Sequence, residues 1–305
     1  MKSKRTYWLL ALLVVLAVIT YFVTTDRGER TTTYKLEKQI LTVDSALVDR
    51  IQIDQNGKSI TLAKSGMEWR ETQPIDYLAY QQFISSALSN LKGYKLESKV
   101  SDNPENKEKF GFNDTNVAKI TVYQGGQLVG SFLIGNASSG PSQTYIKKIE
   151  GNDIYLADGL LRSNFVKGDL YEWRDKLITA IPKNSITSLE MISQTENYKM
   201  VRDSTGKYFV GKDSVNNGVA EGVFNILQNF NTQGFKDTTV GNDIKFDNVI
   251  KVSTNKPIEI DFWKSGEGPN PKYLLKITDN KQIFEVDENF VKNIFKSKKD
   301  MLGIK

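Results

Sequence analysis

The group of ionisable side chains best suited to form a site lies in a short stretch near the middle of the chain. Asp169, Glu172, Arg174, Asp175 and Lys176 fall within one short segment of the sequence. If residues 170–178 form a helix, Glu172 and Lys176 lie about one turn apart and can form an ion pair. The cluster predicts either an ion-paired segment that orients the join between two domains, which we favour, or a ligand site at that join.

The sequence contains no histidine and no cysteine, which limits the chemistry that this cluster could perform. Disulfides, thiolate nucleophiles, Ser–His–Asp triads and metals held by histidine or cysteine are all excluded. Acid–base catalysis would depend on Asp, Glu, Lys or Tyr, and no isolated acidic pair stands in an apolar setting. We therefore expect no enzymatic activity, no cofactor and no metal. A hydrolase that uses carboxylates alone is the least favoured alternative.

Two tryptophans could mark surfaces that bind a partner or a glycan. Trp173 adjoins Arg174 and Asp175 at the expected domain join, and Trp263 precedes a loop at 266–271 that contains glycine and proline. Aromatic side chains are common at interfaces, but they are more often buried in cores. Trp173, Arg174, Asp175 and Trp263 are the predicted interaction residues, with burial favoured for the two tryptophans.

Residues 1–25 predict a membrane anchor. Residues 7–23 carry no charge, and threonines at 6, 24 and 25 extend the stretch to the roughly 20 residues that a bilayer requires. Lys2, Lys4 and Arg5 precede it, so the N-terminus is expected in the cytoplasm and the remainder of the chain outside. Residues 19–25 are too bulky for a signal-peptide cleavage site. An uncleaved anchor in the cytoplasmic membrane is favoured over a cleaved signal peptide or a buried core helix.

The charge balance of the exported part indicates no specialised surface. The chain has 41 basic and 36 acidic residues, a net charge of +5. Residues 1–30 contribute five basic and two acidic residues, which leaves 36 against 34, or +2, for the rest. This balance gives no support to nucleic-acid binding. Residues 26–47 are polar and predict a stalk.

The part of the chain after the stalk predicts two similar α+β domains, at residues 48–182 and 183–305. Each begins with alternating strands joined by short turns, such as Asn56–Gly57. An amphipathic helix follows in each, at 74–93 and 219–234, and then further antiparallel strands and a short helix. Residues 88–91 and 227–230 align between the two helices. Antiparallel sheets with packed helices are the expected fold, and chance similarity of the two halves is the alternative.

The order of these features resembles a bacterial family known as domain of unknown function 4340. The matching segments are the opening strands up to Trp69, residues 74–76, 109–112 and 169–176, and Gly135, Tyr145 and Tyr155–Leu156. The resemblance implies a single-pass envelope protein, often encoded beside gliding-motility-type ABC transporters. It thus implies an accessory subunit with ABC transporter subunits as the protein partner. A module that binds a cell-wall or extracellular polymer is the alternative function.

Overall fold

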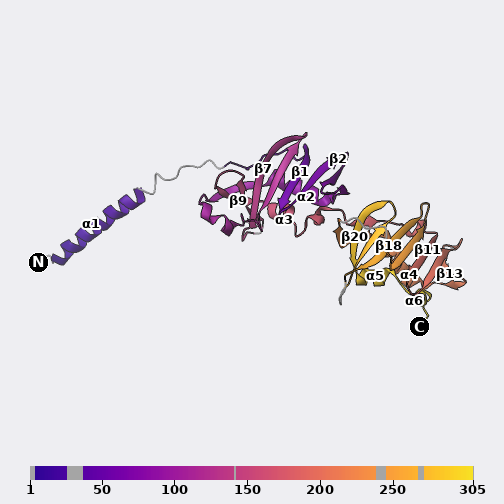
Figure 1. Ribbon diagram of the computed structural model, residues 1–305. Coiled ribbons are helices and arrows are strands. Elements are labelled where there is room, and N and C mark those ends of the chain that lie inside the picture. The colour runs from indigo at the N-terminus through magenta and orange to yellow at the C-terminus, as the bar shows by residue number, and fades with distance from the viewer. Residues whose placement is uncertain (1–3, 26–36, 141, 238–244, 267–270, 305) are drawn as a thin grey trace.

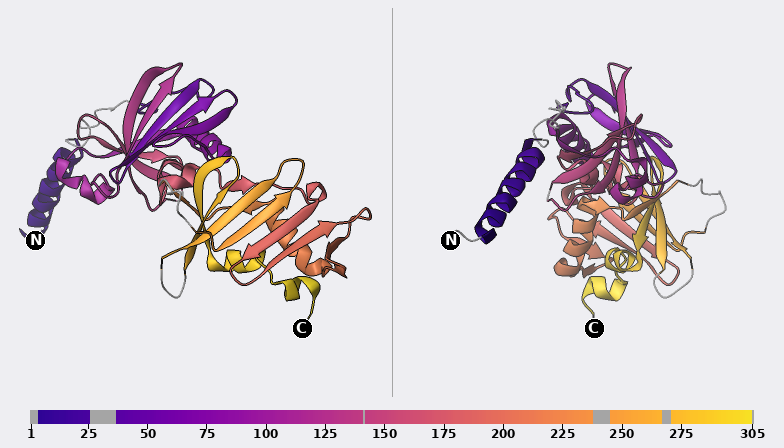
Figure 2. Two further views of the ribbon diagram at one scale, coloured as in Figure 1. Left: turned by 45° about the vertical axis from the view of Figure 1, so that its right-hand side comes forward. Right: turned by 90° about the vertical axis from the view of Figure 1, so that its left-hand side faces the viewer.

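The computed structural model describes residues 4–25, 37–140, 142–237, 245–266 and 271–304. Within these residues two large antiparallel sheets, each of nine strands, account for most of the fold, and helices pack against them (Figures 1 and 2). The predicted combination of antiparallel sheets and packed helices is therefore confirmed.

The N-terminal helix is α1 (Lys4–Thr25). The first domain contains β1 (Val48–Gln55), β2 (Lys58–Ser65), β3 (Glu68–Gln73), β4 (Tyr77–Leu78), α2 (Gln81–Gly93), β5 (Lys95–Ser101), η1 (Pro104–Asn106), η2 (Glu108–Phe110), β6 (Ala118–Gln124), β7 (Gln127–Ala137), β8 (Gln143–Lys148), β9 (Ile154–Asp158) and α3 (Leu161–Phe165). The linker contains η3 (Leu170–Trp173), β10 (Leu177–Thr179) and η4 (Lys183–Ser185). The second domain contains β11 (Ser188–Ser193), β12 (Asn197–Arg202), β13 (Tyr208–Val210), β14 (Asp213–Ser214), α4 (Asn217–Gln228), β15 (Phe230–Asn231), β16 (Gly234–Lys236), β17 (Asn248–Ser253), β18 (Ile258–Ser265), β19 (Lys272–Ile277), β20 (Asn280–Asp287), α5 (Glu288–Ile294) and α6 (Lys298–Leu302).

The two large sheets have the same strand order. The first runs β4-β3-β2-β1-β6-β7-β8-β9-β5, and the second runs β14-β13-β12-β11-β17-β18-β19-β20-β16. In each domain the long helix, α2 or α4, leaves one edge of the sheet, and the chain then returns as the strand at the opposite edge. The helix therefore connects the two edges of its own sheet, and its apolar side covers one face.

Alternation of apolar and polar residues along the strands produces a separate core in each domain. Ile51 and Ile53 of β1 are fully buried, and Ile84 of α2 belongs to the same cluster. Phe224 and Leu227 of α4 occupy the corresponding place in the second domain. Complete burial of such a side chain contributes about 1.5–3 kcal/mol to stability. Each sheet thus has its own helix-covered core.

The first long helix begins later than the sequence predicted. Residues 74–76 were expected to cap it, but they precede β4, and α2 begins at Gln81. The Gln81 side-chain amide donates to the carbonyls of Trp69 and Ala79, at 2.9 and 2.7 Å, and its oxygen accepts from the Trp69 N–H at 2.8 Å. These bonds tie the start of α2 to β3. The two residues of β4 are too few to show alternation, so the sequence does not predict this strand.

The helix α1 is separated from both domains (Figure 1). Its apolar side chains between Leu12 and Tyr21 include many that are more than half exposed. Across the described residues, no helix combines the length and the apolar character that crossing a membrane requires. The membrane span predicted for residues 1–25 is therefore not confirmed.

Residues 37–47 are part of the first domain, although their sequence predicts the end of a stalk. Val43 is buried in the first core, and Ile40 and Leu41 pack against it. The backbone N–H of Leu96 donates to the carbonyl of Lys38 at 2.9 Å, which fixes the segment beside β5. The three apolar side chains explain why this segment folds against the domain, because burying them in the core is more favourable in free energy than exposing them on a spacer. Residues 26–36 of the predicted stalk lie outside the described residues.

Two glycines determine how the segment at 109–112 packs against β7. Gly111 has φ +82°, a left-handed conformation that favours glycine, and a Cβ atom there would overlap Asn136. A Cβ atom at Gly135 would overlap the carbonyl oxygen of Phe110. The Phe110 ring packs edge-on against Tyr145 at 4.7 Å. This part of the family resemblance therefore has a packing role.

Candidate functional site at the domain junction

The charged segment of the linker is a single helical turn followed by extended chain. The Asp169 side chain accepts from the Tyr171 N–H at 3.1 Å, and the Glu172 side chain accepts from the Asp169 N–H at 3.1 Å. This reciprocal capping box starts η3, which ends at Trp173, and Arg174 is extended with φ −81° and ψ 148°. The helix considered for residues 170–178 does not form, so Glu172 and Lys176 do not share a helix face.

The linker is hydrogen-bonded to both domains. On the first domain, the N–H of Tyr80 donates to the carbonyl of Trp173 at 2.7 Å, and the N–H of Asp175 donates to the carbonyl of Leu78 at 2.9 Å. On the second domain, the N–H of Thr232 donates to the carbonyl of Lys176 at 2.9 Å. The strands β10 and β15 then pair as a small antiparallel sheet. The residues around Arg174 are thus fixed from both sides.

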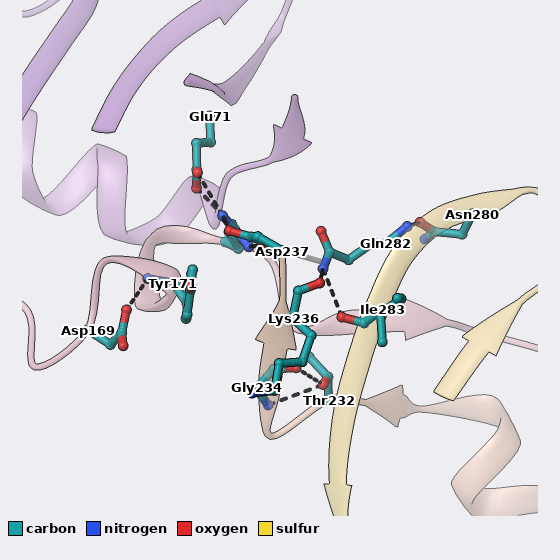
Figure 3. Close-up of polar contacts among 11 residues, drawn as sticks. Glu71, Asp169, Tyr171, Thr232, Gly234, Lys236, Asp237, Asn280, Gln282 and Ile283 are labelled. Carbon is teal, nitrogen blue, oxygen red and sulfur yellow. Dashed lines mark hydrogen bonds and ion pairs between the residues drawn. The ribbon is translucent and has the colours of Figure 1, made fainter. Parts of the chain in front are cut away.

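Arg174 joins the two domains through a buried ion-pair network. Its Nε and Nη2 donate to the two carboxylate oxygens of Glu71 in β3, at 2.8 and 2.9 Å. Its Nη1 and Nη2 donate to the two oxygens of Asp237, which follows β16, at 2.7 and 2.8 Å. Figure 3 shows Glu71 and Asp237 reaching the same region from the two domains. The side chains of Arg174 and Glu71 are each 1% exposed and that of Asp237 is 18% exposed.

Aromatic rings pack around the Arg174 guanidinium, which is shielded from water together with Glu71. The guanidinium carbon of Arg174 lies 4.6 Å from the ring centre of Tyr171 and 5.2 Å from that of Phe235. Tyr77 of β4 packs edge-on against Phe235 with ring centres 5.4 Å apart. Burial raises the pKa of Tyr77 to about 12, so its hydroxyl is neutral at physiological pH. The rings of both domains therefore form one continuous apolar contact.

Burial and hydrogen bonding have opposite effects on the pKa values of Glu71 and Arg174. Burial raises the pKa of the Glu71 carboxyl above its ordinary value, and hydrogen bonds from Arg174 offset only part of this. Burial also disfavours the cation of Arg174, but hydrogen bonds to Glu71 and Asp237 outweigh it and raise the pKa of Arg174. Arg174 is therefore always charged, and its charge is compensated by the buried carboxylate of Glu71 and the partly exposed carboxylate of Asp237.

Three of the four predicted interaction residues lie together at the junction, and two of them, Trp173 and Arg174, are buried. Trp173 is fully buried in the first core, and Arg174 is the centre of the ion-pair network. Asp175 is half-buried, and its side chain accepts from the N–H of Leu177 at 3.0 Å. Trp263 lies on β18 of the second sheet, is 8% exposed, and packs against Phe246 at 5.9 Å. Whether any of the four contacts a partner stays a prediction.

The two acidic partners of Arg174 were not among the predicted site residues, although the alternation of β3 and of the chain that continues from β16 points to them. Side chains in a strand alternate between the faces of a sheet, so residues two apart point the same way. Glu71 is two residues after the buried Trp69, and Asp237 is two residues after the buried Phe235. An acidic residue at an inward-facing position predicts a buried cationic partner, and Arg174 is the arginine of the linker.

A shallow pocket of about 460 Å³ lies beside the network, where the linker meets the second domain. Glu172 is engaged with the Asp169 backbone, and Glu285 forms an ion pair with Lys272. Charges of both signs line the pocket, and most acidic ones already have partners. Among the described residues, no group of three or more acidic side chains is placed to hold a metal ion. The pocket is lined by Asp169, Tyr171, Glu172, Lys176, Gln233, Gly234, Phe235, Lys236 and Glu285.

A second buried carboxylate, Asp261, lies on β18 away from the junction. It is 6% exposed, and its Oδ2 lies 3.5 Å from the Lys276 ammonium. Its Oδ1 is buried and has no hydrogen-bond partner among the described residues. Burial raises the pKa of Asp261, the neighbouring Glu259 raises it further, and Lys276 lowers it only in part. The ionised form of this carboxyl is therefore unfavourable in the folded domain.

Asp261→Asn is expected to stabilise the second domain at neutral pH by about 1 kcal/mol, because an amide of the same shape carries no buried charge. The raised pKa gives the sign of the pH dependence. The stability gained from the neutral carboxyl is fully present below the ordinary pKa of 3.8 and is lost as the pH rises through the folded value. Hydrogen exchange of β18 in the full chain, measured at pH 4.5 and 7.5, tests this. Lower protection of β18 in Asp261→Asn than in the unchanged chain at pH 7.5 would contradict the expectation.

The comparison with protein families gives one match. Residues 69–249 match the family described as domain of unknown function (DUF4340). This region is more than half of the 305 residues, and the chain belongs to that family. The matched region extends from β3 to β17 and includes the linker with Arg174. No curated protein and no solved structure matches the chain.

Proposed function

We propose that the chain is a membrane-anchored, extracytoplasmic, non-catalytic protein that serves as an accessory subunit of an ABC-type transport or gliding-type envelope system. In this proposal α1 lies in the cytoplasmic membrane with its N-terminus inside. The two domains, built as a duplicated unit, present a protein-binding surface outside the cell. The apolar sequence of α1 and the basic residues at its N-terminal end, Lys4 and Arg5, support the anchor. The choice of an ABC transporter as partner follows from the family resemblance.

The observation that supports a non-catalytic role most directly is the use of the charges at the junction. Arg174 donates to both oxygens of Glu71 and to both oxygens of Asp237. Arg174, a member of the charged segment at residues 169–176, is thus engaged in holding the two domains together. A charge cluster of this kind gives a body with a fixed shape, which suits a subunit that docks on a partner.

Affinity purification of the tagged full chain from detergent-solubilised membranes tests this proposal. The control bait carries residues 1–36 in front of an unrelated exported domain, so it shares the anchor but lacks both sheets. We expect permease and ATPase subunits of an ABC transporter to be enriched at least tenfold over the control. Equal recovery with both baits, or retention of the full chain on isolated wall polymer instead, would contradict the proposal.

A further inference from the structure

Three lysines with free ammonium groups surround a pocket where residues 37–39 pack onto the first domain. Lys38, Lys92 and Lys95 form no ion pair, and their ammonium groups form no hydrogen bond, among the described residues. All three are exposed. The pocket, called here the stalk pocket, measures about 450 Å³. It is lined by Glu37, Lys38, Gln39, Lys92, Gly93, Tyr94, Lys95 and Leu96.

The stalk pocket has a fixed backbone because residues 38–41 are bonded to the end of α2 and to β5. The Gln39 amide donates to the carbonyls of Lys92 and Tyr94, at 3.0 and 2.7 Å. The N–H of Leu41 donates to the Tyr94 hydroxyl at 2.9 Å. Carbonyls at the C-terminal end of a helix normally attract cations. Here Gln39 occupies two of them, which leaves the lysine ammonium groups available.

The charge of the stalk pocket is positive. Glu37 is its one acidic residue, and it forms an ion pair with Lys148 at 2.8 Å. Burial raises the pKa of Tyr94 to about 12, so the phenol adds no negative charge at physiological pH. The three free lysines are therefore not compensated within the pocket, and the ligand that fits them is an anion.

The chain itself places this pocket close to α1. Twelve residue steps separate Thr25, the last residue of α1, from Glu37. An extended chain spans at most about 3.6 Å per residue, so the pocket lies within roughly 40 Å of the end of α1. If α1 is in a membrane, the nearest extended anionic surface is the layer of lipid headgroups. Screening limits such attraction to about 8 Å at physiological salt, so the first domain must rest directly on that surface.

We propose that the stalk pocket binds the headgroup phosphate of an anionic phospholipid in the same membrane that holds α1, and that this contact seats the first domain on the bilayer. The inference rests on the membrane anchoring proposed above. The ligand chemistry is a phosphate monoanion, met by three ammonium groups, with Leu96 and the Tyr94 ring as the apolar wall. Three lysines near an anionic surface shift such an equilibrium by roughly a hundredfold.

The absence of cysteine allows the full chain to be labelled at one chosen position. A fluorescent donor on Ser89→Cys, in the exposed part of α2, reports the distance of the first domain from acceptor lipids in reconstituted vesicles. A donor on Ser204→Cys reports on the second domain. We expect energy transfer from position 89 to rise when phosphatidylglycerol replaces 30% of the phosphatidylcholine, with a smaller change at 204.

The charge of the stalk pocket is then removed with Lys38→Gln, Lys92→Gln and Lys95→Gln together. The matched control replaces three exposed lysines of the second domain with glutamine: Lys199, Lys207 and Lys212. In vesicles that contain phosphatidylglycerol, we expect the equilibrium that seats the first domain on the bilayer to weaken about a hundredfold in the pocket variant. The control variant should keep the energy transfer of the unchanged chain. An equal response in both variants would overturn the proposal. So would protection of the pocket from hydrogen exchange by inorganic phosphate alone, in phosphatidylcholine vesicles at constant ionic strength.

Flotation separates failure of this inference from failure of the anchor. A chain that does not float with vesicles of pure phosphatidylcholine has no membrane anchor, and the proposed function fails. A chain that floats with both vesicle types, but shows no difference between them in energy transfer at position 89, has an anchor and no lipid-binding pocket.

Discussion

Arg174→Leu is expected to lower the free energy of unfolding by about 3–5 kcal/mol. Leucine leaves the carboxylate of Glu71 buried at 1% exposure without a cation, and it removes the four hydrogen bonds that link this residue to Asp237 and Glu71. Urea denaturation of the full chain in detergent, with hydrogen exchange of β3, measures the loss. Calorimetry should then resolve separate transitions for the two domains, since their shared ion-pair network is gone.

The controls distinguish an unpaired charge from a simple loss of contacts. Arg174→Leu combined with Glu71→Gln removes the stranded carboxylate, so we expect it to recover at least half of the lost stability. Asp237→Asn should cost about 1–2 kcal/mol, because its side chain is 18% exposed and water can compensate. Arg174→Leu with stability within 1 kcal/mol of the unchanged chain would show that the network does not join the domains.

The sheets could be predicted from the sequence because strands such as β2 and β12 alternate between buried and more exposed residues. Asn56 and Gly57 adopt φ 52° and 70°, as the Asn–Gly hairpin signal requires. The edge strands could not be predicted in the same way. β4 and β14 have two residues each, and β5 is a polar edge strand in which Leu96 is the buried residue. Such strands are specified by their neighbours in the sheet, and local alternation does not reveal them.

At the junction too, residues close together in the chain could be predicted, whereas their distant partners could not. Sequence spacing correctly identified a charged segment, because Asp169, Arg174 and Asp175 are close in the chain. It could not identify Glu71, which is 103 positions away from Arg174, or Asp237, which is 63 positions away. The helix considered for residues 170–178 does not form for a local reason: η3 ends after one turn, and Arg174 takes the extended conformation that pairs with Ala79.

Trp173→Ala is expected to cost about 3–5 kcal/mol in the first domain, which is typical of a large side chain removed from a core. Trp173 is fully buried, and its carbonyl accepts from the N–H of Tyr80, so the residue also places the start of α2. If Trp173 instead served as a partner-binding residue, the substitution would weaken binding and leave stability unchanged. Urea denaturation of the full chain, alongside the affinity purification described above, separates these two roles.

Trp173→Phe is the matched control because it preserves an aromatic ring in the core. The Trp173 Nε1 has no hydrogen-bond partner among the described residues, so phenylalanine loses packing volume and no described hydrogen bond of the ring. We expect a loss below about 2 kcal/mol and full recovery of any partner. The Lys167 ammonium lies 5.1 Å from the Trp173 ring and 4.3 Å from that of Phe83, so it keeps one aromatic contact in this variant. Equal losses for alanine and phenylalanine would show that a specific feature of the indole, and not its volume, stabilises the junction.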